Sequence, residues 1–400
     1  MEPSTRVTPA APSRATRPVR VMVVDDAVVV RRLVSDVLDA VSTIEVVGTA
    51  ANGRLALAKL PQLQPDLVIL DVEMPEMDGL ETLTAMREHH RDLPVIMFST
   101  LTERGASITL EALMRGANDY VTKPANVGSV SEAMERVRSE LVPRIHSLCG
   151  LVTPEQRRPK VQSAQPRENH QPTSAGSDRG SLARRVDAVV VGVSTGGPGA
   201  LAEIVPMLPE DLPVPVMVVQ HMPPTFTRLL AERLDGTTPL AVAEAQGGET
   251  IEAGQCWLAP GDRHLALDTV AGVEAPIART GRDERARLVV HDGPREHSCR
   301  PSVDVLFRSA ADRYGPHLLG VVMTGMGQDG LHGCEAIVAA GGRVIVQDEA
   351  TSVVWGMPGV VAEAGLADAV LPLQEIPAEI GRRVVAHRSG ARPGAGVGGR

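Results

Sequence analysis

The chain has few aromatic residues, few cysteines and no long apolar run. Phenylalanine, tryptophan and tyrosine together make up 2% of its 400 residues, so its cores must be built from aliphatic side chains. The four cysteines are scattered, with no C-x-x-C pair and no set of histidines at zinc-ligand spacing, which argues against a zinc motif. No apolar run reaches the length of a membrane span. We therefore expect a cytoplasmic protein that does not insert into a membrane.

Charge and composition divide the chain into two predicted domains. The net charge of −9 argues against a protein that binds nucleic acid, because such proteins normally present a clustered basic surface.

Residues 1–18 contain four prolines and no apolar signal-peptide core, so we expect a disordered tail. The polar, Pro-rich residues 149–185 predict a flexible linker, and residues 389–400 a second disordered tail. The folded domains would then be residues 19–148 and 186–388.

Short apolar runs alternate with amphipathic segments in both predicted domains. Residues 19–148 complete five such pairs, and the pattern resumes at residue 186 with the run VDAVVVGVS. Continuous apolar runs between helices are typical of parallel strands that are buried on both faces. The sequence therefore predicts an α/β protein, with a doubly wound (βα)5 domain followed by a second parallel-sheet α/β domain. The Gly-rich residues 240–292 predict β-hairpins on the second domain.

Polar side chains stand at the ends of the apolar runs in the first domain. They are Asp25, Asp26, Asp71, Ser99 and Lys123. Because parallel strands end at one edge of a sheet, we expect these side chains to converge. Three carboxylates would repel one another unless a hard cation lay among them, and such a site suits Mg²⁺. Acidic residues after strands also cap helices, but capping does not explain the whole set.

Three segments of the first domain resemble a two-component receiver domain: VVDDAVVVRRL, LDVEMPEMDGLETL and YVTKP. The resemblance covers residues 19–146. It implies that Asp71 accepts a phosphoryl group and that Mg²⁺ binds to the carboxylates of Asp25, Asp26 and Asp71 and to the backbone carbonyl of Glu73. It also implies that the bound phosphate is sensed by Ser99, Lys123 and the switch aromatic residue Tyr120.

The second domain opens with a Gly-rich turn that superficially suggests dinucleotide binding. A G-x-G-x-x-G fingerprint that starts at Gly192 needs glycine at position 194, where the chain has Ser194. The next strand should end in an acid for the ribose hydroxyls, and it ends in Gln220 and His221. Dinucleotide binding is therefore disfavoured, although a phosphate cradle at this helix start stays open.

The alternative is nucleophilic catalysis by Ser194, His221 and Asp329. Ser194 lies in the Gly-rich turn, His221 ends the next strand, and Asp329 lies in a Gly-rich loop after a later strand. These positions share the carboxyl edge of one parallel sheet. Serine needs an imidazole to take its proton, and the imidazole needs a carboxylate to fix its tautomer. A serine in a turn and a histidine at a strand end are also common structural residues, so spacing alone does not decide between the two.

The second domain resembles the chemotaxis protein-glutamate methylesterase (CheB) family in five segments: GVSTGGPGAL, VVQHMPPTFT, LAPGDRHL, CRPSVDVLF and MTGMGQDG. With the receiver, the resemblance spans nearly all of residues 19–386. It implies that Ser194 is the nucleophile, His221 the general base and Asp329 the acid that orients it. Thr195 would border the nucleophile and Met326 would supply an oxyanion-hole N–H, and the esterase site would need no cofactor.

Other parts of the family pattern are expected to be structural. Residues 260–264 and 300–304 are predicted to serve loop and helix packing. Five histidines lack metal-ligand spacing and are predicted to be structural or surface residues: His264, His291, His297, His317 and His332.

The resemblance implies a hydrolase, controlled by phosphorylation, that removes methyl esters from glutamates on the cytoplasmic helices of chemoreceptors. Glutamine deamidation is the expected second activity, a chemotaxis histidine kinase the expected phosphodonor, and a monomer the expected state. One alternative is a receiver joined to a catalytically inactive partner-binding module. A second alternative, a DNA-binding response regulator, would need a compact basic helix-turn-helix after the linker, where this chain has a second βα domain.

Overall fold

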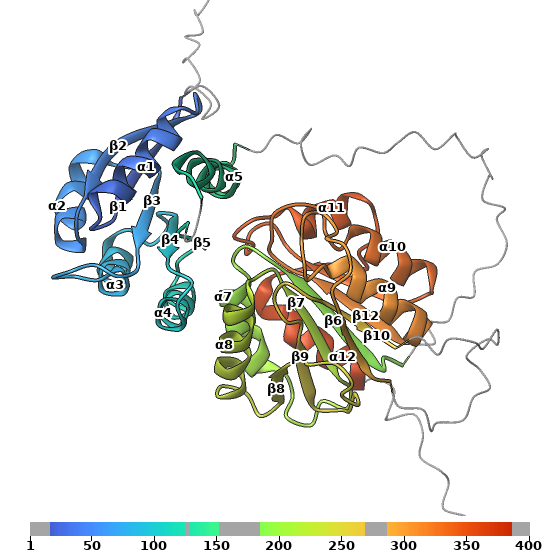
Figure 1. The fold of residues 1–400 in the computed structure, drawn as a ribbon. Coiled ribbons are helices and arrows are strands. Elements are labelled where there is room, and N and C mark those ends of the chain that lie inside the picture. Colours follow the sequence, from blue (N-terminus) through green and yellow to red (C-terminus); the bar gives the residue numbers. More distant parts are fainter. Residues whose placement is uncertain (1–16, 125–127, 152–184, 269–285, 386–400) are drawn as a thin grey trace, which may run out of the picture. The chain divides into compact units, whose positions relative to one another are not determined.

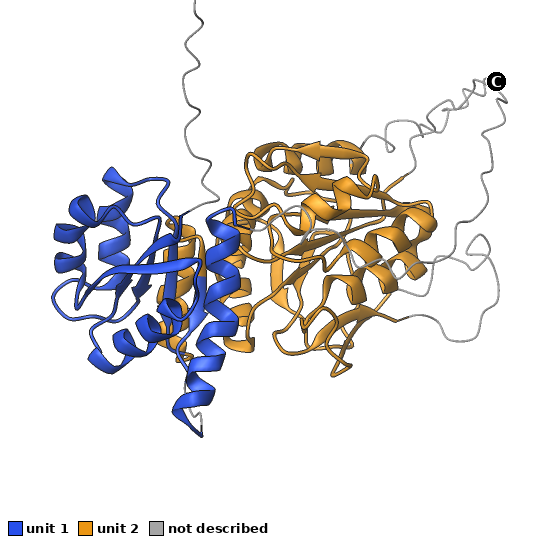
Figure 2. Cartoon of the chain, turned by 90° about the horizontal axis from the view of Figure 1, so that it is seen from above, with its two compact units in different colours: residues 1–100, 120–151 blue, residues 101–119, 152–400 orange. Residues whose placement is uncertain are grey.

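The computed structural model describes residues 17–124, 128–151, 185–268 and 286–385. The predicted tails and linker, residues 1–18, 149–185 and 389–400, lie outside these ranges except for a few residues at their edges. The chain divides into two compact units, residues 1–100 with 120–151 and residues 101–119 with 152–400 (Figure 2). No helix in the described ranges is both long and apolar enough to cross a lipid bilayer.

The receiver-like part of the chain contains a five-stranded sheet in the order β2-β1-β3-β4-β5 (Figure 1). Its strands are β1 (Val19–Val24), β2 (Ile44–Ala50), β3 (Leu67–Asp71), β4 (Val95–Ser99) and β5 (Asp119–Thr122). The helices between and after them are α1 (Val28–Asp39), α2 (Gly53–Leu63), α3 (Gly79–His89), α4 (Glu103–Met114) and α5 (Val130–Leu148). The strand order and the parallel pairing of β1, β2, β3 and β4 confirm the doubly wound (βα)5 prediction.

Aliphatic side chains hold the first sheet between its helices. The helices α1 and α5 pack together, as do α2 and α3. Strand β1 has the sequence VRVMVV, and four of its valines and Met22 are buried. Asn52 and Asp78 cap the amino ends of α2 and α3 with their side chains, which fixes where these helices begin. The loops that precede both helices lie at the carboxyl edge of the sheet, where the acidic residues stand.

The second unit has a seven-stranded, all-parallel sheet in the order β14-β13-β12-β6-β7-β9-β8. Its strands are β6 (Ala188–Val193), β7 (Val216–Gln220), β8 (Ala241–Glu244), β9 (Gln255–Leu258), β12 (Leu318–Val322), β13 (Arg343–Gln347) and β14 (Ala369–Leu371). Its helices include α7 (Gly197–Ile204), α8 (Pro224–Asp235), α9 (Val303–Tyr314), α10 (Leu331–Ala339), α11 (Met357–Glu363) and α12 (Ile376–Val385). Helices α9, α10 and α11 lie on one face of the sheet, and α7, α8 and α12 lie on the other (Figure 1).

The region predicted to form β-hairpins has a mixed structure. Strands β10 (His264–Leu267) and β11 (Leu288–His291) pair antiparallel, which agrees with the prediction. Strands β8 and β9 lie in the same stretch, but they extend the parallel sheet instead of forming a hairpin. The short helix α11 and the three-residue strand β14 had no counterpart among the predicted elements.

The topology brings the predicted catalytic residues to the middle of the second sheet. Strand β6 pairs with β12 on one side and with β7 on the other. All three strands are parallel, so the segments that follow them leave the sheet at one edge. Ser194 directly follows β6, His221 directly follows β7, and Asp329 lies between β12 and α10.

Candidate functional site

Ser194 lies in a tight turn between β6 and α7. Its backbone N–H donates to Thr324 O at 3.0 Å, and the side chain of Gln220 donates to Ser194 O at 3.0 Å. Gly196 has a φ of 78°, in the left-handed region that favours glycine. A Cβ atom on Gly197 would overlap the side-chain oxygen of Gln220. The two glycines are therefore needed for the turn that presents Ser194 at the sheet edge.

The turn that holds Ser194 packs against the loop that follows β12. A Cβ atom on Gly325 would lie 2.9 Å from Ser194 Cβ and would overlap the sulfur of Met357. Thr324 also donates its hydroxyl to Thr195 O at 2.8 Å. Because only glycine fits beside Ser194, the sequence at position 325 fixes how closely the two loops approach.

Asp329 and His221 form a hydrogen-bonded pair. His221 Nε2 lies 2.8 Å from Asp329 Oδ2. An ionised carboxylate only accepts hydrogen bonds, so this contact places a proton on Nε2 and leaves Nδ1 as the nitrogen that can take a proton. Burial opposes the charged imidazolium, but hydrogen bonds to Asp329 and Cys299 outweigh burial and raise the pKa of His221, so they stabilise the imidazolium that forms once Nδ1 takes a proton.

The amino end of α9 surrounds the Asp329 carboxylate with donors. Oδ1 accepts from Ser302 Oγ at 2.8 Å and from Asp304 N at 3.0 Å, and Oδ2 accepts from Val303 N at 2.7 Å. Burial alone would raise the pKa of this carboxyl group, but the hydrogen bonds from His221 and from the α9 backbone hold it below its usual value. A helix amino terminus favours negative charge, so Asp329 stays ionised beside the imidazole.

Ser194 is the member of the predicted triad whose side chain does not contact the other two by a hydrogen bond within the described residues. Within the described residues its hydroxyl makes no hydrogen bond, and the side chain is partly exposed. Contacts between a nucleophile and its base often become short only when substrate is bound. The structure therefore brings His221 and Asp329 into direct contact and places Ser194 on the neighbouring strand, without a Ser194–His221 hydrogen bond.

Thr195 and Met326 stand beside Ser194 in the two loops. Thr195 follows Ser194 directly and is buried, and Met326 follows Gly325, which packs on Ser194. Within the part of the chain that the structure describes, the backbone N–H groups of Thr195 and Met326 donate no hydrogen bond. Two unpaired amides next to a nucleophile are what an oxyanion hole requires.

Residues 300–304 were predicted to serve loop and helix packing, and two of them, Ser302 and Asp304, also make hydrogen bonds around Asp329 that the sequence did not predict. Ser302 donates to Asp329, as described above, and Asp304 holds the loop on which Asp329 sits. Asp304 Oδ1 accepts from Gly330 N at 3.0 Å and from Gly333 N at 2.6 Å. The signal available was the pattern S-x-D at a helix start, because side chains there commonly bond to backbone N–H groups. His264 is structural as predicted: it is buried and accepts from Ser302 N at 3.2 Å.

The acidic residues of the first unit meet at the carboxyl edge of its sheet. Asp25 follows β1 and Asp71 ends β3, and both carboxylates are buried. Lys123 Nζ lies 2.8 Å from Asp25 Oδ2 and 2.8 Å from Asp71 Oδ1. The neighbouring Asp26 is exposed. The carboxylate oxygens of Asp25, Asp26 and Asp71 lie within 4.8 Å of one another.

The burial of Asp71 and the charges around it favour the binding of a cation. Burial raises the pKa of its carboxyl group to about 6, and nearby Asp25 adds to this effect, while Lys123 opposes it. Asp71 Oδ2 is buried without a hydrogen-bond partner among the described residues. A buried, unpartnered oxygen among three carboxylates fits an oxygen-preferring divalent ion such as Mg²⁺.

Of the remaining predicted receiver residues, Glu73 contacts Asp71, and Ser99 and Tyr120 lie on strands β4 and β5 of the same sheet. Glu73 donates its backbone N–H to Asp71 Oδ1 at 3.3 Å. Ser99 ends β4, is fully buried and donates its hydroxyl to Thr100 O at 3.2 Å. Tyr120 lies on β5 and is 9% exposed. Their predicted parts in carbonyl coordination and phosphate sensing stay predictions.

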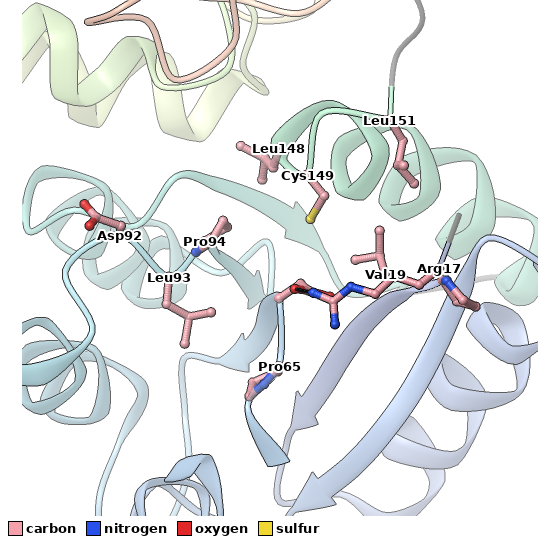
Figure 3. A pocket seen from close by; sticks show the side chains of 11 residues that line it. Arg17, Val19, Pro65, Asp92, Leu93, Pro94, Leu148, Cys149 and Leu151 are labelled. Carbon is pink, nitrogen blue, oxygen red and sulfur yellow. Dashed lines mark hydrogen bonds and ion pairs between the residues drawn. The ribbon is translucent and has the colours of Figure 1, made fainter. Parts of the chain in front are cut away.

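A hollow of about 400 Å³ lies at the opposite edge of the first sheet (Figure 3). Its lining comes from the segments that precede β1, β3 and β4 and from the end of α5, including Val19, Leu93 and Cys149. An ion pair between Arg17 and Asp66, 2.8 Å long, closes one side. The hollow lies at the amino ends of the strands, and Asp71 at their carboxyl ends, so it is not part of the acidic site.

Comparison with known proteins places both halves of the chain. Residues 21–135 match the response regulator receiver domain, and residues 189–380 match the CheB methylesterase. A protein-glutamate methylesterase/protein-glutamine glutaminase of Trichodesmium erythraeum is 49% identical over 368 residues, which are 91% of this chain and 99% of that protein. A protein of the same name from Nocardioides is 51% identical over 378 residues, 94% of this chain and 98% of that protein. The chain belongs to the CheB methylesterase family.

Family membership confirms the predicted pairing of a receiver with a methylesterase domain. Among solved structures, the CheB methylesterase catalytic domain of Thermotoga maritima is 41% identical. It covers 49% of this chain and 98% of the Thermotoga chain, with a TM-score of 0.45.

Proposed function

We propose that this CheB family member hydrolyses glutamate methyl esters on the cytoplasmic helices of chemoreceptors, under the control of phosphorylation at Asp71. The observation that carries the proposal is the His221–Asp329 pair beside the Ser194 turn. Asp329 is held ionised by the amino end of α9, which is the state in which it can orient an imidazole. Relatives that cover nearly the whole chain carry the same activity in their names.

The chemistry proposed for this site uses the unoccupied nitrogen of His221. Ser194 Oγ attacks the ester carbonyl carbon while His221 Nδ1 takes the hydroxyl proton. The carbonyl oxygen becomes negative and accepts from the N–H groups of Thr195 and Met326, and one such donor is worth about 2.7–4 kcal/mol in the transition state. The proton then passes to the leaving methoxide, and methanol departs. Water, deprotonated by His221, attacks the acyl-enzyme and releases the glutamate carboxylate and Ser194.

Glutamine deamidation follows from the same steps. A glutamine side chain presents a carbonyl of the same shape, and ammonia leaves in place of methanol. Acylation of Ser194 then gives the same acyl-enzyme from either substrate, and one hydrolysis step yields glutamate. We therefore include protein-glutamine deamidation in the proposed function.

The receiver is proposed to accept its phosphoryl group on Asp71 from a chemotaxis histidine kinase. Mg²⁺, held by Asp25, Asp26, Asp71 and the Glu73 carbonyl, would neutralise the charge of the incoming phosphate. The Asp71 carboxylate attacks phosphorus, and Lys123, already 2.8 Å from Asp71 Oδ1, pairs with the transferred oxygens. Ser99 and Tyr120 would respond to the new charge and lift an inhibition of the hydrolase.

Methanol release from methylated receptor fragments tests the proposal. We expect release from wild-type protein, a several-fold increase with Mg²⁺ and a small phosphodonor, and no release from Ser194→Ala. Asp71→Asn should keep the basal rate but lose the increase, because an amide cannot form the acyl phosphate. Near-wild-type turnover in folded Ser194→Ala would refute the nucleophile, and equal stimulation of Asp71→Asn would refute the acceptor.

Chemical labelling distinguishes the proposed hydrolase from the alternative, a catalytically inactive module that only binds a partner. A serine-directed phosphonate should modify Ser194 in the wild type, because His221 can take its proton. A folded protein that binds receptor fragments but is never labelled would support the binding module instead.

A further inference from the structure

Cys299 lies against the face of His221 that Asp329 does not occupy. Its Sγ is 3.7 Å from His221 Nδ1, while Asp329 holds Nε2 on the other side of the ring. The Cys299 side chain is partly exposed, so small solutes can reach it. Cys256 and Cys334, in the same unit, are buried. Cys299 therefore contacts the same imidazole, that of His221, which the proposed mechanism uses as its base.

The separation of these two atoms matches the geometry of a zinc site. In tetrahedral sites Zn–S is about 2.3 Å and Zn–N about 2.0–2.1 Å, which sets the two ligand atoms about 3.6 Å apart. Cys299 Sγ and His221 Nδ1 are 3.7 Å apart. One ion could therefore bind both atoms with little movement of either residue.

The other ring nitrogen of His221, Nε2, has the kind of hydrogen-bond partner that is typical of zinc-binding histidines. Such histidines commonly donate their other N–H to a carboxylate, which fixes the tautomer and makes the free nitrogen a better ligand. Asp329 accepts from Nε2 at 2.8 Å and is itself held by α9. Ligand atoms of His221, Cys299 and Asp329 all lie within 4.8 Å of one another.

We propose that Cys299 and His221 form an inhibitory binding site for a thiophilic divalent cation, best fitted by Zn²⁺. On binding, the Cys299 thiol loses its proton to solvent, Nδ1 of a protonated His221 does the same, and the thiolate and the neutral Nδ1 then each donate an electron pair to the ion. Water fills the remaining positions. The proposal rests on the proposed function, because the bound ion occupies the nitrogen that takes the proton of Ser194. Two protein ligands make a weaker site than the four of structural zinc sites, which suits reversible inhibition.

The two metal sites of the protein would then select different ions. Asp25, Asp26 and Asp71 offer oxygen ligands, which suit Mg²⁺, whereas a thiolate and an imidazole suit Zn²⁺. Mg²⁺ should therefore support activation at the receiver without occupying the esterase site. Zn²⁺ should inhibit even in the presence of excess Mg²⁺.

Inhibition of the full-length enzyme by Zn²⁺ provides the first test. We expect Zn²⁺ to stop methanol release, a chelator to restore it, and Cys299→Ala to need at least ten times more Zn²⁺ for half inhibition, each variant being compared with its own metal-free rate. Two control variants should keep wild-type sensitivity: Cys149→Ala, which removes the partly exposed cysteine of the first unit, and His332→Ala, which removes an exposed histidine near His297.

A spectroscopic test does not depend on activity. Co²⁺ bound to a thiolate gives a sulfur-to-cobalt charge-transfer band, which we expect in the wild type and not in Cys299→Ala. A band with no methanol release from any variant would leave the metal site standing and contradict the proposed function. Equal Zn²⁺ inhibition of wild type and Cys299→Ala, or no difference between their Co²⁺ spectra, would overturn the site.

Discussion

Replacing Asp329 by asparagine tests the electrostatic arrangement at the centre of the second unit. Both carboxylate oxygens accept hydrogen bonds: Oδ1 from Ser302 Oγ and Asp304 N, and Oδ2 from Val303 N and His221 Nε2. An asparagine has one NH₂ group, which in either orientation points a donor at a donor. The substitution therefore cannot be accommodated by turning the amide over.

The structure sets the size of two separate effects. One backbone or hydroxyl donor of α9 loses its acceptor, which costs about 1–3 kcal/mol of unfolding free energy. With the NH₂ group at the Oδ2 position, which leaves only Val303 N of the α9 donors unpaired, His221 also loses the acceptor that places its proton on Nε2. Removing this function in a serine-histidine-aspartate triad lowers turnover about 10⁴-fold, or about 5.5 kcal/mol. The second effect is the larger, so we expect a folded protein with almost no activity.

The assay combines methanol release with chemical denaturation of the same samples. Asp348→Asn is the matched control, because Asp348 Oδ1 accepts from Thr351 N at 3.0 Å and from Thr351 Oγ1 at 2.6 Å in the loop after the neighbouring strand β13. It should lose stability while keeping activity within a few-fold of wild type. The triad assignment fails if folded Asp329→Asn keeps more than a tenth of wild-type activity.

Three further substitutions or conditions probe other parts of the structure. Gly325→Ala should lower activity about 100-fold and the free energy of unfolding by about 1–3 kcal/mol, because the added methyl group would overlap Met357 and press on Ser194. Gly236→Ala is the control: a Cβ atom there meets nothing closer than 3.7 Å, so both activity and stability should stay at the wild-type level. In metal-free protein the pKa of Asp71 is raised to about 6, so the fold favours the protonated acid. The free energy of unfolding should then fall as the pH rises from about 4 through about 6, and a pH-independent denaturation midpoint would contradict this. Asp71→Asn should abolish that pH dependence and make the first unit more stable at neutral pH, as thermal unfolding in a chelator would reveal.

The predicted catalytic residues could be found from sequence because they come at the ends of parallel strands. Ser194 and His221 directly follow β6 and β7, which are neighbours in the sheet. Asp329 follows β12, on the other side of β6. Strand ends of one parallel sheet share an edge, so large separations along the chain did not hide the pair of His221 and Asp329. Their catalytic roles stay proposals that the experiments above test.

Contacts made by loops and helix starts could not be predicted in the same way. Cys299 precedes α9 and is 78 residues from His221, with no motif that links the two. Spacing along the chain detects metal ligands only when they share one local motif, and here they come from separate elements. The donors of α9 were missed for a related reason, since backbone N–H groups have no sequence signature beyond the helix start itself.

The pattern of apolar residues also failed to predict some of the helices and strands. Helix α11 has seven residues, starts with Met-Pro-Gly and offers barely two turns in which to display a period. Strand β14 has three residues and lies at the edge of the sheet. Strands β8 and β9 lie in a Gly-rich stretch that favours turns, but pairing with β7 decides their direction. In each case tertiary contacts outweigh a short local signal.

The two units place an aspartate at equivalent edges of parallel sheets and give it opposite properties. Asp71 is buried beside Asp25, has one oxygen without a hydrogen-bond partner among the described residues, and has a raised pKa. Asp329 is buried too, but it accepts hydrogen bonds from His221 and the amino end of α9, and its pKa is lowered. The charge of the first aspartate is compensated only at Oδ1, by Lys123 and the Glu73 N–H, so its buried Oδ2 is left for a cation to bind. The second is compensated by fixed protein donors, so it stays ionised and needs no cation. The difference between a phosphoryl acceptor and an orienting acid therefore lies in the donors that the neighbouring elements provide, not in the residue or its place in the fold.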